Sequence, residues 1–257
     1  MKTMLAFSLM VICSGVAAAQ DWAKARLEQS PRHGEFVMVK SGERDVPCYV
    51  VYPEKKEKTP AVVVIHEIFG LTDWVRGVCD QLAEAGYLAI APDYLGGQVF
   101  ESVDDARRAV SGLSSEQVVA DTKAASDYVK ALPAANGVVA VAGFCWGGAK
   151  VWEYAATAKD LAAGYVFYGT GPDTASAVEG ISAPIYGFYA ENDARVNATL
   201  NTTVALMAEA KKPFDPVTYA GAGHGFMRAG EAPDASAENK DARQEAWQRW
   251  KSLLGEL

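Results

Sequence analysis

Residues 138–147 read Val-Val-Ala-Val-Ala-Gly-Phe-Cys-Trp-Gly. The first five are apolar, as in a strand buried on both faces, and a helix-like segment follows at 148–158. Gly143 and Gly147 flank Cys145 and permit a sharp bend, because glycine has no Cβ atom to clash. A strand, a Gly-x-Cys-x-Gly turn and a helix are typical of a nucleophile elbow, here with cysteine instead of serine. Cys145 is therefore a candidate nucleophile; the alternative is an inert packing residue.

The composition indicates one globular domain that does not bind nucleic acid. The chain has 257 residues, of which 50% are hydrophobic and 22% charged, and its net charge is −8. No basic stripe is present, which argues against a nucleic-acid partner. Only three histidines occur, with no Cys-x-x-Cys or His-rich cluster, so we predict no metal and no cofactor. We expect a monomer that acts on a small molecule.

The first 19 residues have the pattern of a signal peptide. Lys2 precedes an apolar segment at 4–13, and Ala17-Ala18-Ala19 supplies a cleavage site before Gln20. The apolar segment is short for a bilayer span, which disfavours an uncleaved anchor, and the bulky Ile12 disfavours a lipoprotein at Cys13. We therefore predict a secreted protein of the bacterial periplasm without stable membrane association, whose single domain is residues 20–257.

Removal of Cys13 leaves three cysteines. Cys48 lies in a strand-like segment and Cys79 in a helix-like one. A disulfide between them is possible in an oxidising compartment, although two buried free thiols are the favoured interpretation. In either case Cys145 is the odd, reactive thiol.

Strand-like and helix-like segments alternate along the rest of the chain. Strands are predicted at 35–39, 46–52, 61–66, 87–91, 138–142, 164–168, 184–189 and 217–219. Helices are predicted at 73–85, 115–132, 148–158, 198–211 and 237–254, with a short helix within 93–113. This alternation predicts an α/β fold, a doubly wound and mostly parallel sheet with helices on both faces. In such sheets, sites form beyond the carboxyl ends of the strands.

Four segments should meet at that edge: 66–70, the turn at Cys145, 190–193 and 221–226. Their order of nucleophile, acid and histidine is that of α/β-hydrolases. His224 would accept the thiol proton, and Asp193 would fix the imidazole tautomer. Three alternatives stay open: Asp193 as a helix cap, Glu191 as the triad acid, and His224 as a residue of a surface turn.

Backbone groups near Cys145 are candidates for an oxyanion hole. The N–H groups of Trp146, after the nucleophile, and Ile68, in the loop after an earlier strand, have the expected positions. His66 is expected to form a structural hydrogen bond at the strand end rather than to act in catalysis. Glu67 places a negative charge beside this loop, which is unfavourable unless the carboxylate has a function.

These motifs together carry a resemblance. His-Glu-Ile-Phe-Gly at 66–70, Gly-Phe-Cys-Trp-Gly-Gly at 143–148, the Asp193 loop and Gly-His-Gly-Phe-Met-Arg at 223–228 resemble the dienelactone hydrolase family. The similarity runs from about residue 46 to the last predicted helix. It implies an α/β-hydrolase fold, a Cys-Asp-His triad and hydrolysis of small carboxylic esters or lactones, of the carboxymethylenebutenolidase type.

The resemblance also implies roles for Glu67 and for arginines. Glu67 would contact the thiol, be displaced by an anionic substrate and then take the thiol proton. Arg228 matches one of the arginines that hold the substrate carboxylate. Arg107 and Arg108 compete for the second position, where Arg108 is favoured, and a solvated helix face is the alternative for both. A broader carboxylesterase, a non-catalytic binding protein and a redox role of Cys145 remain as other functions.

Overall fold

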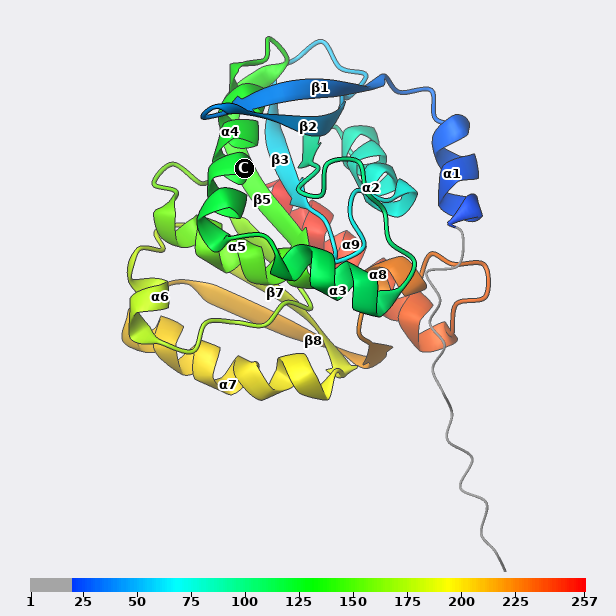
Figure 1. Ribbon diagram of the computed structural model, residues 1–257. Helices are drawn as coiled ribbons and strands as arrows, with labels where there is room; N and C mark the ends of the chain where they lie inside the picture. Colours follow the sequence, from blue (N-terminus) through cyan, green and yellow to red (C-terminus); the bar gives the residue numbers. More distant parts are fainter. Residues whose placement is uncertain (1–19) are drawn as a thin grey trace, which may run out of the picture.

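The computed structural model describes residues 20–257, so the predicted signal peptide lies outside the described residues. Eight strands form one sheet in the order β1-β2-β4-β3-β5-β6-β7-β8 (Figure 1). β1 pairs antiparallel with β2, and β2 with β4, whereas all other neighbours are parallel. The strands are β1 (Gly34–Ser41), β2 (Arg44–Val51), β3 (Thr59–Ile65), β4 (Leu88–Pro92), β5 (Ala135–Phe144), β6 (Gly164–Phe167), β7 (Ile185–Asn192) and β8 (Phe214–Gly223).

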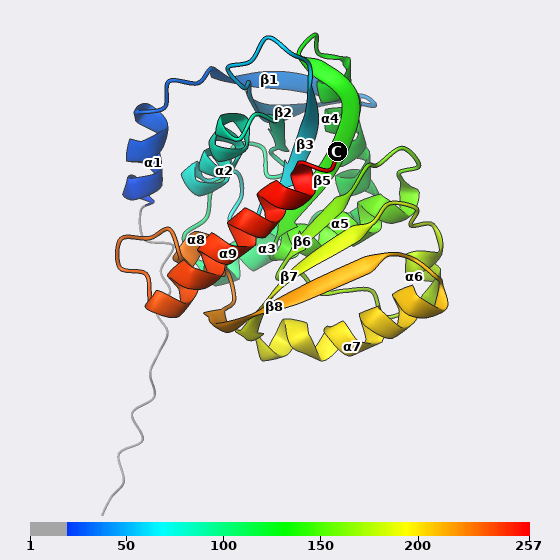
Figure 2. The same cartoon turned by 180° about the vertical axis from the view of Figure 1, so that it is seen from behind.

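Helices cover both faces of this sheet, as predicted. The helices are α1 (Asp21–Glu28), α2 (Asp73–Glu84), α3 (Val103–Ser111), α4 (Ser115–Ala131), α5 (Trp146–Thr157), α6 (Ala175–Glu179), α7 (Ala194–Glu209), α8 (Phe226–Ala229) and α9 (Ala237–Leu254). α2 and α9 pack on one face, whereas α4 and α5 pack on the other (Figures 1 and 2). None of the helices within residues 20–257 is long and apolar enough to cross a membrane.

The central strand β3 explains why the sequence shows an unbroken apolar run there. Val62 and Val64 belong to the core with α2 and α9, whereas Val63 and Ile65 belong to the core with α4 and α5. All four side chains are fully buried. Because both faces of β3 are covered, no position on the strand favours a polar side chain.

The two remaining cysteines are free thiols on opposite faces of the sheet. Cys48 packs in the core with α4, and Cys79 in the core with α2. Burial raises the pKa of Cys48 to about 12 and raises that of Cys79 further. The sheet lies between them, so the structure holds no disulfide between Cys48 and Cys79, and both thiols stay protonated and unreactive at neutral pH.

Three short helices, α1, α6 and α8, were not predicted, and the limits of two elements, α7 and β8, differ from the predicted ones by four residues at one end. α7 begins at Ala194 rather than at 198, because the Asp193 side chain accepts a hydrogen bond from the Val196 N–H and caps the helix. β8 extends over Phe214–Gly223, so His224 follows directly after its carboxyl end. The missed helices have four to eight residues. Helices of this length depend on tertiary contacts more than on their own sequence.

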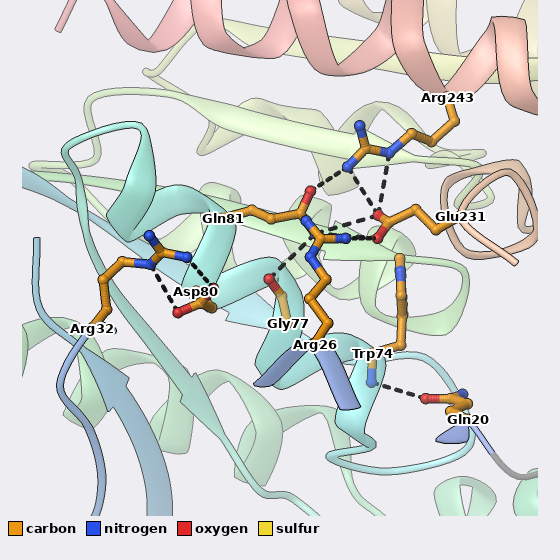
Figure 3. Close-up of polar contacts among 9 residues, drawn as sticks. All are labelled: Gln20, Arg26, Arg32, Trp74, Gly77, Asp80, Gln81, Glu231 and Arg243. Carbon is orange, nitrogen blue, oxygen red and sulfur yellow. Dashed lines mark hydrogen bonds and ion pairs between the residues drawn. The ribbon is translucent and has the colours of Figure 1, made fainter. Parts of the chain in front are cut away.

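Polar contacts hold the N-terminal segment against α2 and against the segment between α8 and α9 (Figure 3). The Gln20 side-chain oxygen accepts a hydrogen bond from the Trp74 N–H in the first turn of α2, at 2.8 Å. Arg26 of α1 pairs with Glu231 at 2.7 Å, and Glu231 also accepts hydrogen bonds from Arg243 of α9. The N-terminal segment thus joins α2 to the segment between α8 and α9.

Candidate active site

The turn between β5 and α5 raises Cys145 above the end of the sheet. Cys145 has a φ of 55°, a left-handed conformation that is uncommon for a residue with a side chain. A Cβ atom at Gly143 would collide with the Gly147 carbonyl, and one at Gly147 with the carbonyls of Ile65 and His66. Both glycines are therefore required by close backbone packing, and the strained Cys145 is the point at which the chain turns.

Three side chains from three loops form one hydrogen-bonded series. The Sγ of Cys145 lies 3.1 Å from Nε2 of His224, and Nδ1 of His224 lies 2.5 Å from Oδ2 of Asp193. The imidazole is partly exposed, whereas Asp193 is only 5% exposed. The thiol, the imidazole and the carboxylate are within contact in the order that a nucleophile, a base and an orienting acid require.

Asp193 has two roles that the sequence presented as alternatives. Its Oδ2 atom binds His224, while its Oδ1 atom accepts the hydrogen bond from Val196 that caps α7. Glu191, the rival acid, is exposed and accepts a hydrogen bond from the Gly221 N–H at 2.7 Å instead. Glu191 therefore fixes the end of β8 near His224 and does not contact the imidazole.

The environment of His224 favours its charged form. Burial lowers the pKa of His224, but hydrogen bonds to Asp193 and Cys145 outweigh that effect and raise the pKa to about 10. Burial of Asp193 raises its own pKa, and the hydrogen bond from His224 outweighs this, so that the pKa falls below its usual value. The site therefore favours the imidazolium that forms when His224 accepts the thiol proton, and Asp193 stays ionised beside it.

A second buried carboxylate, that of Glu67, lines the same cavity as Cys145. Glu67 is 3% exposed, and its Oε2 atom accepts a hydrogen bond from Nε of Arg228 at 2.7 Å. Its Oε1 atom lies 3.4 Å from the hydroxyl of Tyr168. The expected hydrogen bond between Glu67 and the Cys145 thiol is not found among the described residues. A guanidinium forms much stronger hydrogen bonds to a carboxylate than the weak S–H donor does.

The candidate residues line a cavity of about 670 Å³. Ile68 and Trp146 lie in its wall together with Cys145, Glu67 and His224. Neither the Ile68 N–H nor the Trp146 N–H donates a backbone hydrogen bond to another residue within 20–257. Two unpaired donors beside the nucleophile fit the requirements of an oxyanion hole.

The structure corrects the second arginine. Arg107 lines the cavity, whereas Arg108 points away, with its side chain 77% exposed and paired with Asp105 at 3.1 Å. The two residues are consecutive on α3, so their side chains are separated by about 100° around the helix and only one faces the site. The prediction assumed the wrong rotation of α3 about its axis. The buried Ala106 and Val110 determine which side of the helix faces the protein.

Sequence reasoning missed two further residues. Arg195 lines the cavity from the first turn of α7, and Tyr168 holds Glu67 and packs its ring edge against His224 at 5.2 Å. Tyr168 also has a positive φ of 40°, directly after the end of β6. Tyr168 and Arg195 both follow the carboxyl end of a parallel strand. This position in the sequence could have indicated that they belong to the site. No group of three or more potential metal ligands occurs within residues 20–257.

Comparison with known proteins agrees with this geometry. A relative from Saccharolobus solfataricus, provisionally named carboxymethylenebutenolidase, is 30% identical over 235 residues, which cover 76% of this chain and 88% of the relative. One with the same name from Escherichia coli is 29% identical and covers 92% of this chain and 93% of the relative.

Solved structures extend the similarity to the fold. A provisionally assigned dienelactone hydrolase from Klebsiella pneumoniae superimposes with a TM-score of 0.79 at 26% identity, over 88% of this chain and 99% of that one. A dienelactone hydrolase-like promiscuous phosphotriesterase from metagenomic libraries has a TM-score of 0.79 at 25% identity, over 88% of this chain and 98% of that one. The profile of the Dienelactone hydrolase family matches residues 46–257. The chain therefore belongs to the dienelactone hydrolase family, whose members are α/β-hydrolases that act on ester bonds.

Proposed function

We propose that this protein is a cysteine hydrolase of small carboxylic esters or lactones that forms an acyl-thioester on Cys145. The observation that carries the proposal is the unbroken series from the Cys145 sulfur through His224 to Asp193, with distances of 3.1 Å and 2.5 Å. The two unpaired N–H groups beside the sulfur supply what acyl transfer needs in addition.

In the first half of the reaction, the thiol proton passes to Nε2 of His224 as Sγ attacks the carbonyl carbon. The carbonyl oxygen becomes an oxyanion, which the N–H groups of Ile68 and Trp146 stabilise. When the carbon–oxygen ester bond breaks, the leaving oxygen takes the proton from His224. In a lactone this oxygen remains attached to the acyl chain.

In the second half, a water molecule gives its proton to His224 and attacks the thioester carbon. The carbon–sulfur bond then breaks, and the carboxylic acid leaves. The proton on His224 returns to the sulfur or remains paired with the thiolate. Asp193 keeps the Nδ1 proton of His224 in place throughout, so that Nε2 always faces the reacting atoms.

We infer that the preferred substrate carries a carboxylate. Arg107 and Arg195 line the cavity and form no ion pair with other residues of the described part of the chain. A substrate carboxylate that reaches Arg228 would compete with Glu67 for the same guanidinium. A displaced Glu67 would then be able to accept the thiol proton, which links thiolate formation to substrate binding.

A broader carboxylesterase is the second candidate, and the engagement of Arg228 by Glu67 favours it. A neutral ester does not need to displace Glu67, because it has no carboxylate that would bind the Arg228 guanidinium. The cavity also has apolar walls at Phe69, Val103 and Val110 that suit an uncharged acyl group. The two candidates differ in whether a carboxylate on the substrate increases kcat/KM.

The deciding experiment is a hydrolysis panel of lactones and p-nitrophenyl esters, each with and without a carboxylate, on the wild type and Cys145→Ala. We expect Cys145→Ala to lose at least about 10³-fold in kcat. Equal turnover by both proteins would remove the proposed role of Cys145, and no turnover by either would leave a binding protein. Rapid labelling of Cys145 by iodoacetamide is expected of the enzyme, and slow labelling of an ordinary thiol would favour the binder.

We also propose that the protein is exported to a bacterial periplasm after cleavage before Gln20, and that it acts as a monomer. The proposal of export rests on the signal-like pattern of residues 1–19. N-terminal sequencing of protein from a periplasmic fraction should begin at Gln20. Size-exclusion chromatography with light scattering should give the mass of one chain.

A further inference from the structure

His66 is a completely buried histidine whose side chain the proposed reaction does not use. It follows directly after β3 and is 0% exposed. Its Nδ1 atom lies 2.6 Å from the carbonyl oxygen of Glu67, while its Nε2 atom has no partner among the described residues. A buried polar atom without a partner is unfavourable, which makes an arrangement of this kind a reason to look for a function.

The contact determines which nitrogen carries the proton. Burial lowers the pKa of His66, so the ring is neutral and carries one N–H. A carbonyl oxygen only accepts hydrogen bonds, and therefore the proton is on Nδ1, which donates to Glu67. Nε2 is then an unprotonated acceptor.

The carbonyl that His66 holds belongs to the peptide whose N–H is that of Ile68. In a trans peptide the C=O and N–H bonds point in opposite directions. A carbonyl fixed toward the buried His66 ring therefore turns the Ile68 N–H away from it, on the side where Ile68 lines the cavity. A hydrogen bond to the carbonyl also polarises the peptide and strengthens its N–H as a donor.

His66 also contacts the residue that supplies the second donor. Its ring stacks on Trp146 with centroids 5.6 Å apart and planes inclined by 25°. Tyr94 packs edge-on against both rings, at 5.2 Å from His66 and 5.8 Å from Trp146. The Gly147 backbone packs so closely on the carbonyls of Ile65 and His66 that it leaves no room for a side chain. The His66 imidazole thus contacts the peptide of one proposed oxyanion donor and the side chain of the other.

We propose that His66 is a positioning residue of the oxyanion hole. Its Nδ1–H fixes the Glu67–Ile68 peptide while its ring supports Trp146, so that the two N–H groups converge on the same oxygen. This role rests on the proposed acyl transfer at Cys145 and adds a residue to it. His66 acts through the two donors and does not touch the substrate.

Two substitutions separate the hydrogen bond from the ring. His66→Phe keeps an aromatic ring against Trp146 and removes the donor, whereas His66→Asn places an N–H near the Nδ1 position and removes the ring. We expect His66→Phe to lower kcat about 10- to 100-fold, somewhat less than deletion of a whole oxyanion donor, with KM within about twofold. His66→Asn should keep kcat within about fivefold of the wild type, because it retains the donor to Glu67.

Alkylation of Cys145 by iodoacetamide is the matched control, since this displacement forms no oxyanion. Its rate should be unchanged in both variants, and both should show a cooperative thermal transition. An unchanged kcat in His66→Phe, or alkylation that falls in parallel with kcat, would overturn the positioning role. Failure of the proposed function is a separate result, because it would appear as Cys145-independent hydrolysis in the wild type.

A measurement on the wild type keeps the inference testable if His66→Phe does not fold. Imidazole ¹⁵N NMR should show the His66 proton on Nδ1, without titration between about pH 6 and pH 8. A proton on Nε2 would place a lone pair against the Glu67 carbonyl and contradict the proposal.

Discussion

Two buried carboxylates line the same cavity as the Cys145 sulfur, and they are bonded to different kinds of cation. Asp193 and Glu67 are 5% and 3% exposed, and each accepts a short hydrogen bond from a basic side chain. The partner of Asp193 is His224, which titrates, and the partner of Glu67 is Arg228, which keeps its proton at all accessible pH values. The first pair can carry a proton to and from the thiol. The Glu67–Arg228 pair can change the electrostatic field at the Cys145 sulfur only if its two side chains move apart.

This difference assigns separate tasks to two similar ion pairs. The Asp193–His224 pair is anchored, since Asp193 also caps α7. The Glu67–Arg228 pair is held by Tyr168 and by the packing of Arg228 over the Phe69 ring at 5.4 Å. Glu67 lies on the same loop as Ile68, the proposed oxyanion donor. A substrate anion at Arg228 would therefore act on the loop that binds the reacting oxygen.

The largest expected effect comes from breaking the titrating pair. Asp193→Asn keeps a side chain that caps α7 but removes the charge that fixes the His224 tautomer. We expect kcat to fall about 10²- to 10⁴-fold with little change in the folded structure. Steady-state kinetics on the best ester of the panel, with circular dichroism as the control for folding, measures this. Retention of more than a tenth of kcat would exclude Asp193 as the triad acid.

Breaking the Glu67–Arg228 pair should lower activity less than Asp193→Asn does. It should also change how the reactivity of the Cys145 thiol responds to substrate. In Glu67→Gln we expect about a tenfold loss of kcat/KM on carboxylate-bearing esters, because an amide displaced by the substrate cannot accept the thiol proton. Alkylation of Cys145 should also stop responding to a bound substrate analogue. Glu191→Gln is the control, since Glu191 lies at the same edge but contacts neither Cys145 nor Arg228. Full turnover in Glu67→Gln, together with alkylation that ignores substrate in the wild type, would end the proposed role.

Arg107 and Arg195 sharpen the comparison, because these two cations of the cavity have no carboxylate partner within residues 20–257. Arg107→Gln should raise KM for a carboxylate-bearing ester about fivefold and leave a neutral ester unaffected, through loss of one exposed charge-assisted contact. Arg108→Gln is a matched control from the next position on α3, whose side chain faces solvent. An equal effect of both substitutions would indicate a general electrostatic effect of the surface charge instead of a contact between Arg107 and the substrate.

The smallest effect concerns stability against pH. Since the pKa of His224 is raised from 6.5 to about 10, its pair with Asp193 stabilises the folded state fully below about pH 6.5. That stabilisation declines as the pH rises toward 10. Urea unfolding should therefore show a larger difference between the wild type and Asp193→Asn at pH 6 than at pH 10. A difference that is constant across this range would mean that His224 is not held in its charged form.

The sequence alone was sufficient for the order of the eight strands along the chain and for most of the candidate residues that line the cavity. Apolar runs such as 61–65 and the paired glycines around Cys145 are local signals, and each has one physical explanation. Parallel strands place their carboxyl ends at one edge, so the segments with Cys145, Asp193 and His224 were predicted to meet there. Arg107 was the local failure, because the phase of a short helix depends on what it packs against.

What only the tertiary structure decided were the choices between partners. Sequence could not say whether Glu67 binds the thiol or Arg228, because these groups come from loops more than 70 residues apart. It could not show that Asp193 caps α7 and binds His224 at once, or that the His66 ring contacts both the Glu67 carbonyl and the Trp146 ring. Hydrogen bonds depend on distances of tenths of an ångström, and side chains compete for them only after the chain has packed. The amino-acid order determined which groups reach the edge of the sheet, and the packing determined which of them bind each other.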